Sequence, residues 1–573
     1  MFIKNDFVFH NPYWKTAYQI NEDTLGLIVQ IRKDIKLKKV LLHYGDPYTV
    51  LRSDSPWVKK NEKIGNMQVW EHSFNQQMEF FVSDGVFDYY RANTTIKTKR
   101  LHYFFELQVG KKSLYLTRFN LYDEWPKNIH DECYTWAYLT KGNLKTIPDW
   151  LPNTVWYQIF VDRFFKTGKK KRKPLDLWGK EPGRLNYFGG DLKGIIKKLD
   201  YLKNLGITGL YLTPIFKAES NHKYDTTDYL SIEPDFGDEK VLKQLIDSAH
   251  QKGIRVMLDA VFNHSGWFFQ PWQDVIKNLD KSKYKNWFYI NNFNQLKKLR
   301  SSIDLTDEKN FNFNYYPYET FAFAAYMPRL NWMNPGVQEY LKKVVTKWTK
   351  LGIDGWRLDV ANEPAFEFWR NFRRWAKEIN PNIYILGEIW YDSTPWISGD
   401  MFDGVMNYPL RGLIIDAALH PNKKFFETNF SKFLLSYNAY DATGMFNILS
   451  SHDVPRLLTI LKGNEHKFLF AYQLLFLFSG SPCIFYGDEI GLDGDQDPGC
   501  RKCMIWDSKE QNQNLLSEIK NLIAQRKKND IFAKGEWTLE KTSDFHSTSL
   551  VKKYKNKKIN VKIDWTNLKI KLT

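Results

Sequence analysis

Cysteine is scarce in this chain, with four residues among 573. Cys500 and Cys503 form a C-x-x-C pair, but the sequence offers no second pair and no nearby histidine doublet, so a zinc or redox site is weakly supported. Unpaired thiols in a reducing compartment are the favoured interpretation.

Long apolar runs are also missing. The longest, Phe468–Phe478, is interrupted by Gln473 and is too short to cross a bilayer, so it predicts a buried helix. The first residues contain no continuous apolar stretch, and we therefore expect no signal peptide. Together these features predict a cytoplasmic protein without a membrane partner.

Positive charge is in excess but is not concentrated. The net charge is +17, from 82 Lys and Arg against 65 Asp and Glu, yet only Lys169–Lys173 forms a dense basic run. Nucleic-acid binding predicts a coherent basic stripe, so this run is better explained as a solvated loop and no nucleic-acid partner is expected. Aromatic residues are abundant, which suits either large cores or the stacking of sugar rings.

The pattern along the chain indicates three regions. Residues 1–145 contain short β-like runs such as Leu25–Val29 and Val40–Tyr44, which predict an N-terminal β-sandwich. Strand and helix patterns alternate over 146–529 and predict a parallel sheet covered by helices. Residues 530–573 return to short β-like runs and predict a small C-terminal β segment.

The alternating region contains eight strand-like segments, the number that a (β/α)8 TIM barrel requires. An open doubly wound sheet is the alternative, disfavoured because no G-x-G-x-x-G follows the first strand. An irregular insertion at about 264–335 is long enough to suggest a functional loop. The eight segments are Val155–Val161, Thr208–Pro214, Ile254–Phe262, Gly352–Val360, Ile383–Ile389, Gly404–Asn407, Phe446–Ser450 and Cys483–Tyr486.

Several of these strands end in ionisable residues. A single Asp in such a place most often caps a helix, but the strand ends of a TIM barrel meet at one mouth, so capping explains four strands poorly. Carboxylates that converge suit glycoside hydrolysis, which needs a protonated acid opposite a second carboxylate. The residues are Asp259, His264, Arg357, Asp359, Glu388, His452 and Asp453.

Arg357 stands two residues before Asp359, so both side chains project from the same face of the strand. We expect this fixed cation to keep Asp359 ionised, as a nucleophile must be. Crowding by other carboxylates is expected to raise the pKa of Glu388, which suits an acid.

Four segments resemble, in order, the conserved regions of the α-amylase superfamily, glycoside hydrolase family 13. They are Asp259–His264, Gly355–Glu363, Gly387–Trp390 and Ser451–Asp453. Further segments are similar to the neopullulanase, cyclomaltodextrinase and maltogenic amylase group, namely Val360–Glu363, Met327–Asn331 and Asp497–Met504. The resemblance implies a sandwich like a starch-binding module and a homodimer in which that domain packs over the partner's barrel.

The resemblance also implies roles for individual residues. Asp359 would be the nucleophile, Glu388 the general acid/base, and Asp453 the group that binds sugar hydroxyls and stabilises the oxocarbenium-like state. The residues expected to hold the sugar rings are Tyr224, His264, Phe321, Arg357, Trp390 and His452. Phe321, like Phe323 beside it, is as readily explained by a small core within the insertion.

The sequence departs from the family in two places. Phe366 stands where the second region usually has His, which leaves the ratio of hydrolysis to transfer open. Related enzymes often bind calcium in the loop after the first strand, but Phe165–Lys173 has no acidic ligand, and Gly190 and Asp191 alone supply too few oxygens. We therefore expect the calcium site to be lost and no cofactor to be needed.

The sequence thus predicts a retaining hydrolase of α-1,4 bonds in cyclodextrins, maltooligosaccharides or pullulan, with some transglycosylation. An α-1,6-glucosidase or a glucanotransferase of the same superfamily is the alternative. A non-catalytic glucan-binding protein is a third interpretation, disfavoured because Asp359, Glu388 and Asp453 are all present.

Overall fold

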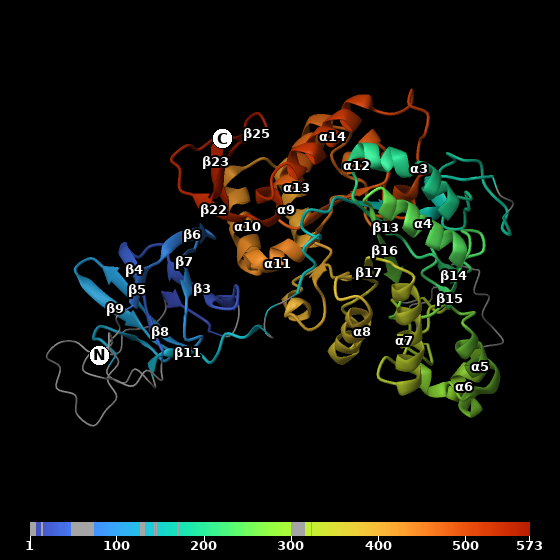
Figure 1. Cartoon of the computed structure of the whole chain (residues 1–573), viewed down its shortest axis with the longest axis horizontal. Helices are drawn as coiled ribbons and strands as arrows, with labels where there is room; N and C mark the ends of the chain where they lie inside the picture. The colour runs from blue at the N-terminus through green and yellow to red at the C-terminus, as the bar shows by residue number, and fades with distance from the viewer. Residues whose placement is uncertain are drawn as a thin grey trace.

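The computed structural model describes residues 7–12, 15–46, 74–126, 132–141, 144, 146–168, 171–299, 316–322 and 324–573. Phe323 lies outside the described residues. Figure 1 shows a blue all-β region at the N-terminal end, a central region of strands wrapped by helices, and a red C-terminal region beside the orange helices.

The N-terminal region consists of two antiparallel sheets that enclose a common core. One has the order β1-β3-β7-β6 with β2 beside β3, and the other has the order β10-β9-β8-β4-β5 with β11 beside β8. Buried side chains such as Val29 and Leu42 fill the space between them. The strands are β1 (Val8–Phe9), β2 (Ala17–Gln19), β3 (Thr24–Arg32), β4 (Leu37–Gly45), β5 (Phe74–Gln77), β6 (Glu79–Ser83), β7 (Phe87–Thr95), β8 (Leu101–Val109), β9 (Lys112–Leu116), β10 (Leu121–Tyr122) and β11 (Tyr134–Trp136).

The central region is a closed parallel barrel with strand order β19-β18-β17-β16-β13-β12-β21-β20. A parallel bridge between Met406 and Phe446 joins the two outer strands and closes it. Each predicted segment overlaps one strand, so the TIM barrel is confirmed. The strands are β12 (Trp156–Ile159), β13 (Gly209–Leu212), β16 (Arg255–Ala260), β17 (Gly355–Leu358), β18 (Tyr384–Gly387), β19 (Gly404–Val405), β20 (Phe446–Asn447) and β21 (Ser481–Phe485).

Helices between the strands cover the barrel. In the first long one, Asp191 caps the N-terminus by accepting the Gly194 N–H at 2.7 Å, and Gly206 ends the helix with φ 100°. Within the described part of the chain, no helix is both long and apolar enough to cross a membrane. The helices are α2 (Val161–Phe164), α3 (Leu192–Leu205), α4 (Glu239–Gln251), α7 (Pro335–Lys350), α8 (Phe366–Ile379), α9 (Tyr408–Leu419), α10 (Lys423–Ser436), α11 (Ala439–Gly444), α12 (Leu457–Ile460), α13 (Glu465–Leu477), α14 (Gln513–Lys527) and α15 (Ile531–Lys534).

Two excursions rise above the strand ends of the barrel. A hairpin of β14 (Phe216–Ala218) and β15 (Thr226–Ile232) follows β13. The insertion after β16 contains α5 (Gln270–Asn278) and α6 (Phe293–Leu299), and isolated bridges such as His264 with Arg329 hold its two arms together. The described part of the insertion, residues 264–299, 316–322 and 324–335, therefore contains regular elements where the sequence predicted an irregular loop.

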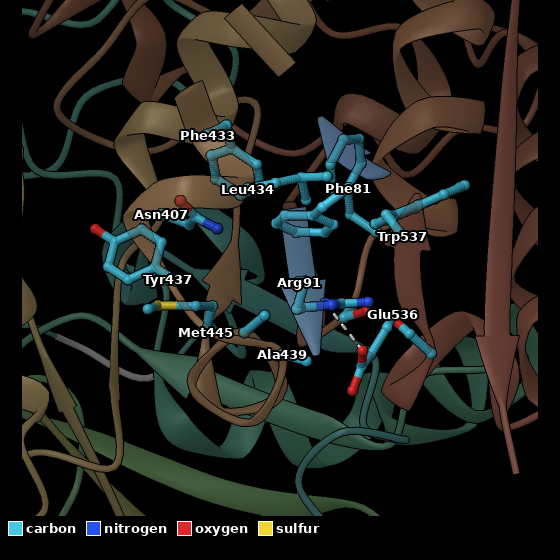
Figure 2. A pocket seen from close by; sticks show the side chains of 14 residues that line it. Phe81, Arg91, Asn407, Phe433, Leu434, Tyr437, Ala439, Met445, Glu536 and Trp537 are labelled. Atoms are coloured by element: carbon cyan, nitrogen blue, oxygen red, sulfur yellow. Dashed lines mark hydrogen bonds and ion pairs between the residues drawn. The ribbon is translucent and has the colours of Figure 1, made fainter. Parts of the chain in front are cut away.

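The C-terminal strands β22 (Glu536–Glu540), β23 (Ser547–Tyr554), β24 (Lys557–Asp564) and β25 (Lys569–Leu572) form one antiparallel sheet. Figure 2 shows where this sheet meets the other two regions: side chains of β6, β7, α10 and β22 line a common pocket. Arg91 of β7 and Glu536 of β22 form an ion pair there, with 3.1 Å between Nη1 and Oε2. The N-terminal sandwich is thus tied to the C-terminal sheet as well as to the barrel.

Candidate active site

Three neighbouring barrel strands bring acidic residues to one mouth. Asp259 lies in β16 opposite Arg357 in β17, and Asp359 and Glu388 directly follow β17 and β18. The ladder continues past the strands, because Asp359 N–H donates to Ala260 O and Glu388 N–H donates to Leu358 O, both at 3.0 Å. The parallel register therefore fixes these side chains side by side at the C-terminal end of the barrel.

Arg357 is the centre of the cluster and is fully buried. Its Nη1 lies 2.9 Å from Asp259 Oδ1 and 2.7 Å from Asp359 Oδ1. Its Nη2 lies 2.8 Å from Glu388 Oε1. One guanidinium thus contacts three carboxylates: Nη1 donates to Asp259 and Asp359, and Nη2 forms an ion pair with Glu388.

Burial controls the protonation of this cluster. It raises the pKa of Asp259 to about 6 and raises the pKa of Asp359 above its usual range, while Arg357 opposes both shifts. Arg357 lowers the pKa of Asp359, as expected from the sequence, but burial outweighs this effect and the net shift is upward. The physical reason is that one buried cation is shared among three carboxylates, and the Glu388 charge adds to the rise for Asp359.

The turn after Asp359 places Glu388. Val360 has φ 46°, a left-handed conformation that is strained for a β-branched residue. In this conformation its N–H donates to Glu388 Oε2 at 3.0 Å. Glu388 Oε1 also accepts the indole N–H of Trp390 at 3.1 Å, so both carboxylate oxygens are oriented.

Tyr224 and His452 form a second layer against Asp259. Tyr224 donates to Asp259 Oδ2 at 3.0 Å, touches His452 Nε2 through the same hydroxyl, and lies parallel to that ring at 5.4 Å. The amide of Gln158 is 2.7 Å from His452 Nδ1, and burial lowers the pKa of His452 well below its usual range. A neutral ring that accepts at Nδ1 keeps its proton on Nε2 and donates it to Tyr224.

Asp453 lies at the rim of this layer. Its carboxylate lies 3.2 Å from His452 Nε2 and 3.4 Å from Arg501 Nη2. Arg501 comes from the segment that carries the C-x-x-C pair, and Cys500 donates its thiol to His452 O at 3.2 Å. Burial raises the pKa of both thiols of the pair to about 12, which agrees with unreactive packing groups.

Two aromatic pairs flank the carboxylates. Phe321, from the insertion, stacks on the buried His264 with 4.7 Å between ring centroids and 10° between planes. Trp390 stacks on Tyr408 at 4.2 Å and leaves 48% of its surface exposed. Phe321 therefore packs against a residue of the site and not into a separate core of the insertion.

The structure joins the predicted residues into one set of contacts, with His264 and Phe321 as a pair beside it. Residues that sequence reasoning missed support this set: Tyr211, which donates to Asp259 at 2.6 Å, and also Gln158, Tyr408 and Arg501. Tyr211 lies inside a strand and Tyr408 begins a helix, so neither position carried a signal. No group of three or more His, Cys, Asp or Glu arranged to hold a metal occurs among the described residues.

Comparison with known proteins agrees with this geometry. Residues 158–570 match the family described as alpha amylase, catalytic domain, and residues 1–140 match the alpha amylase N-terminal Ig-like domain. The chain is 43% identical over 538 residues to a maltogenic alpha-amylase of Bacillus acidopullulyticus, covering 93% of this chain and 86% of that protein. It is 44% identical over 546 residues to a cyclomaltodextrinase of Geobacillus thermopakistaniensis (strain MAS1), with the same coverage. A solved cyclomaltodextrinase structure superposes with a TM-score of 0.86 at 36% identity, over 98% of this chain and 91% of that one.

Proposed function

The chain belongs to the alpha-amylase family of glycoside hydrolases, and from that premise we propose that it is a retaining hydrolase of α-1,4-glucosidic bonds in cyclodextrins, maltooligosaccharides or pullulan. The observation that carries the proposal is that Asp359 and Glu388 contact neighbouring nitrogens of one guanidinium. Retaining enzymes keep their two carboxyl groups about 5–5.5 Å apart, closer than inverting enzymes do.

In the first step, Asp359 attacks the anomeric carbon and forms a glycosyl ester while Glu388 gives its proton to the departing oxygen. The charge of Glu388 is one cause of the raised pKa of Asp359. When Glu388 carries a proton, it no longer repels the negative charge of Asp359. A protonated Glu388 and an ionised Asp359 therefore favour each other.

In the second step, Glu388 is a carboxylate and takes a proton from water, whose oxygen attacks the anomeric carbon and releases Asp359. Configuration is retained because the carbon is inverted twice. We assign to Asp453, His452 and Tyr224 the binding of sugar hydroxyls and of the ring, and to Trp390 a flat exposed face for the sugar beyond the cleaved bond.

Product analysis on γ-cyclodextrin, soluble starch and pullulan tests the proposal, beside Glu388→Gln. Cutting pullulan at α-1,4 bonds gives panose, whereas cutting at α-1,6 bonds gives maltotriose, so one chromatogram separates the proposal from its α-1,6 alternative. Predominantly elongated products would favour a glucanotransferase. A folded wild type that turns over no glucan would favour a non-catalytic glucan-binding protein.

We propose that the family's calcium position is lost here, because the residues present do not fit a calcium ion. Lys171 has a side chain only 3% exposed, and its ammonium donates to Asp191 Oδ2 at 3.0 Å and to Asp235 O. Asp191 also accepts from Thr167 Oγ1 and from the start of α3, so its oxygens are already engaged. EDTA and added Ca2+ should leave the melting temperature and activity of the wild type unchanged. A rise in melting temperature with Ca2+ would contradict this.

We further propose a homodimer formed through the N-terminal domain and a cytoplasmic location. The dimer rests on the family resemblance and on the match of residues 1–140 to the N-terminal domain of the family. The location is supported by four cysteines that are all unpaired and by a relative of Bacillus subtilis named intracellular maltogenic amylase, 39% identical over 95% of this chain and 88% of that protein. Light scattering on the full chain and on a chain lacking residues 1–145 tests the dimer: loss of the dimer only in the truncated chain is expected.

A further inference from the structure

Three aromatic side chains gather where α8 begins and on the loop that follows β18. Trp396, in the short 3-10 helix Thr394–Ile397, meets Phe366 at 5.4 Å and 79°, and Tyr391 at 6.1 Å and 69°. Phe366 is 40% exposed and Tyr391 is 52% exposed. We call Phe366, Tyr391 and Trp396 the aromatic shelf.

The shelf is continuous with the proposed acid. Phe366 is the first residue of α8, which begins seven residues after Asp359, and Tyr391 adjoins Trp390, whose indole donates to Glu388. Helices and loops that follow barrel strands begin on the face where the carboxylates lie. The shelf therefore lies on the face from which a leaving group departs and an acceptor arrives.

The loop that carries Tyr391 and Trp396 is anchored at several points. Asp392 accepts Lys15 Nζ of the N-terminal domain at 2.7 Å and Thr394 Oγ1 at 2.6 Å. The hydroxyls of Ser393 and Tyr437 lie 3.0 Å apart at the end of α10. These contacts hold the exposed rings in place on a fixed loop, so their binding surface is formed in advance.

The chemistry of the shelf differs from that of a sugar subsite. Its rings stand nearly perpendicular to one another and offer apolar edges and faces with one phenolic hydroxyl, because the indole nitrogen of Trp396 is buried. Perpendicular rings favour a further flat ring in edge-to-face contact, whereas a sugar also requires several hydrogen-bond partners. The family's histidine would present a polar ring where this chain has Phe366.

We propose that the aromatic shelf binds the apolar aglycone of an aryl glycoside, so that the enzyme transfers glycosyl units to aryl glycosides in preference to simple sugars. This rests on the proposed function. In the transfer step, an acceptor hydroxyl oxygen attacks the anomeric carbon of the glycosyl ester. The bond to Asp359 breaks, and the hydroxyl proton moves to Glu388.

The test compares two acceptors that share every sugar hydroxyl, phenyl glucoside and methyl glucoside, with maltotriose as donor. For each acceptor, transfer is measured relative to hydrolysis in the wild type and in the double variant F366S/Y391S. We expect the wild type to prefer the phenyl acceptor and the double variant to lose about fivefold of that preference. Phe425, 46% exposed on α10, provides the matched control, and F425S should keep the preference.

Because the preference is a ratio measured on one preparation, partial unfolding of a variant cancels. Equal preference in the wild type and in the double variant overturns the proposal, as does a wild type that transfers equally to both acceptors. A change from dimer to monomer in F366S/Y391S without a change in preference would identify the shelf as a subunit contact, which also overturns it.

Binding is measured separately by saturation-transfer NMR of phenyl glucoside with Glu388→Gln. Signals from the phenyl protons should weaken in the protein that combines Glu388→Gln with F366S/Y391S. They should persist in the protein that combines Glu388→Gln with F425S. This distinguishes failure of the shelf from failure of the proposed function, in which the wild type would not hydrolyse maltotriose although the phenyl signals remained.

Discussion

Replacing Arg357 tests the shared-cation reasoning most directly. In Arg357→Met the three carboxylates keep their burial and lose the cation that contacts all three of them. Since Arg357 opposes the rise in the pKa of Asp359 and of Asp259, both pKa values should increase. An opposite charge at this distance typically shifts a carboxyl pKa by about 1–3 units.

The expected readout is the acid limb of the profile of kcat/KM against pH, which reports ionisation of the nucleophile in the free enzyme. This limb should move upward by about 1–3 pH units in Arg357→Met, and activity at neutral pH should fall accordingly. Arg357→Lys keeps a charge but cannot place two nitrogens between Asp359 and Glu388. Its acid limb should therefore lie between those of the wild type and Arg357→Met.

Loss of a buried ion pair also destabilises a protein, by about 3–5 kcal/mol when one partner is removed. Arg456 provides the control: it is equally buried and pairs with Asp488 at 2.9 Å, away from the carboxylate cluster. Arg456→Lys should lower the melting temperature and leave the acid limb in place. An unmoved limb in folded Arg357→Met would refute the idea that this cation controls the nucleophile.

Three further predictions concern groups around the cluster. Burial raises the pKa of Asp259 from 3.8 to about 6, so the folded protein binds more protons than the unfolded chain between these values. The free energy of unfolding should therefore fall by about 3 kcal/mol as pH rises through this window. Urea titrations of Asp259→Asn at several pH values should not show this fall. Burial raises the pKa of the Cys500 and Cys503 thiols to about 12. At pH 8 a disulfide reagent should therefore label them far more slowly in native than in denatured protein. Rapid labelling of the native protein would contradict the packing. Tyr224→Phe keeps the ring but removes the hydroxyl between Asp259 and His452, so kcat/KM should fall about tenfold, and the protein should lose about 1–3 kcal/mol of stability. Unchanged kinetics would show that the hydroxyl is dispensable.

Much of the fold was predictable because its periodic signals are local. In the helix Leu192–Leu205, for example, apolar residues recur three and four positions apart and a glycine follows at 206, and both signals can be seen in the sequence itself. The barrel followed from alternating strand and helix patterns, and the four sequence segments correctly identified the alpha-amylase family. The order within the insertion was not predictable, since isolated bridges such as that of His264 with Arg329 join positions far apart in sequence.

Part of the candidate site was predictable because its residues lie at strand ends, whereas Tyr224 and Phe321 were predicted from the family resemblance alone. Arg357, Asp359 and Glu388 were found at strand ends, since parallel register carries neighbouring strands to the same level. Tyr211 and Arg501 contact the carboxylates from elements whose sequence showed no feature to separate them from core or loop residues. Such supporting contacts depend on tertiary packing, which a single sequence does not display.

The protonation of the site also depends on tertiary packing. Spacing alone pairs Arg357 with Asp359 and leads to a lowered pKa for that carboxyl, whereas burial in the folded protein, together with the charges of Glu388 and Asp259, reverses the direction. One cation then faces three potential anions in a buried space, so each negative charge disfavours the others. A single added proton relieves the repulsion for all three, and catalysis by the proposed route requires that it reside on Glu388. The orientation of Glu388 by Val360 N–H and Trp390, and of Asp259 by Tyr211 and Tyr224, is therefore as much a part of the acid/base chemistry as the carboxylates themselves.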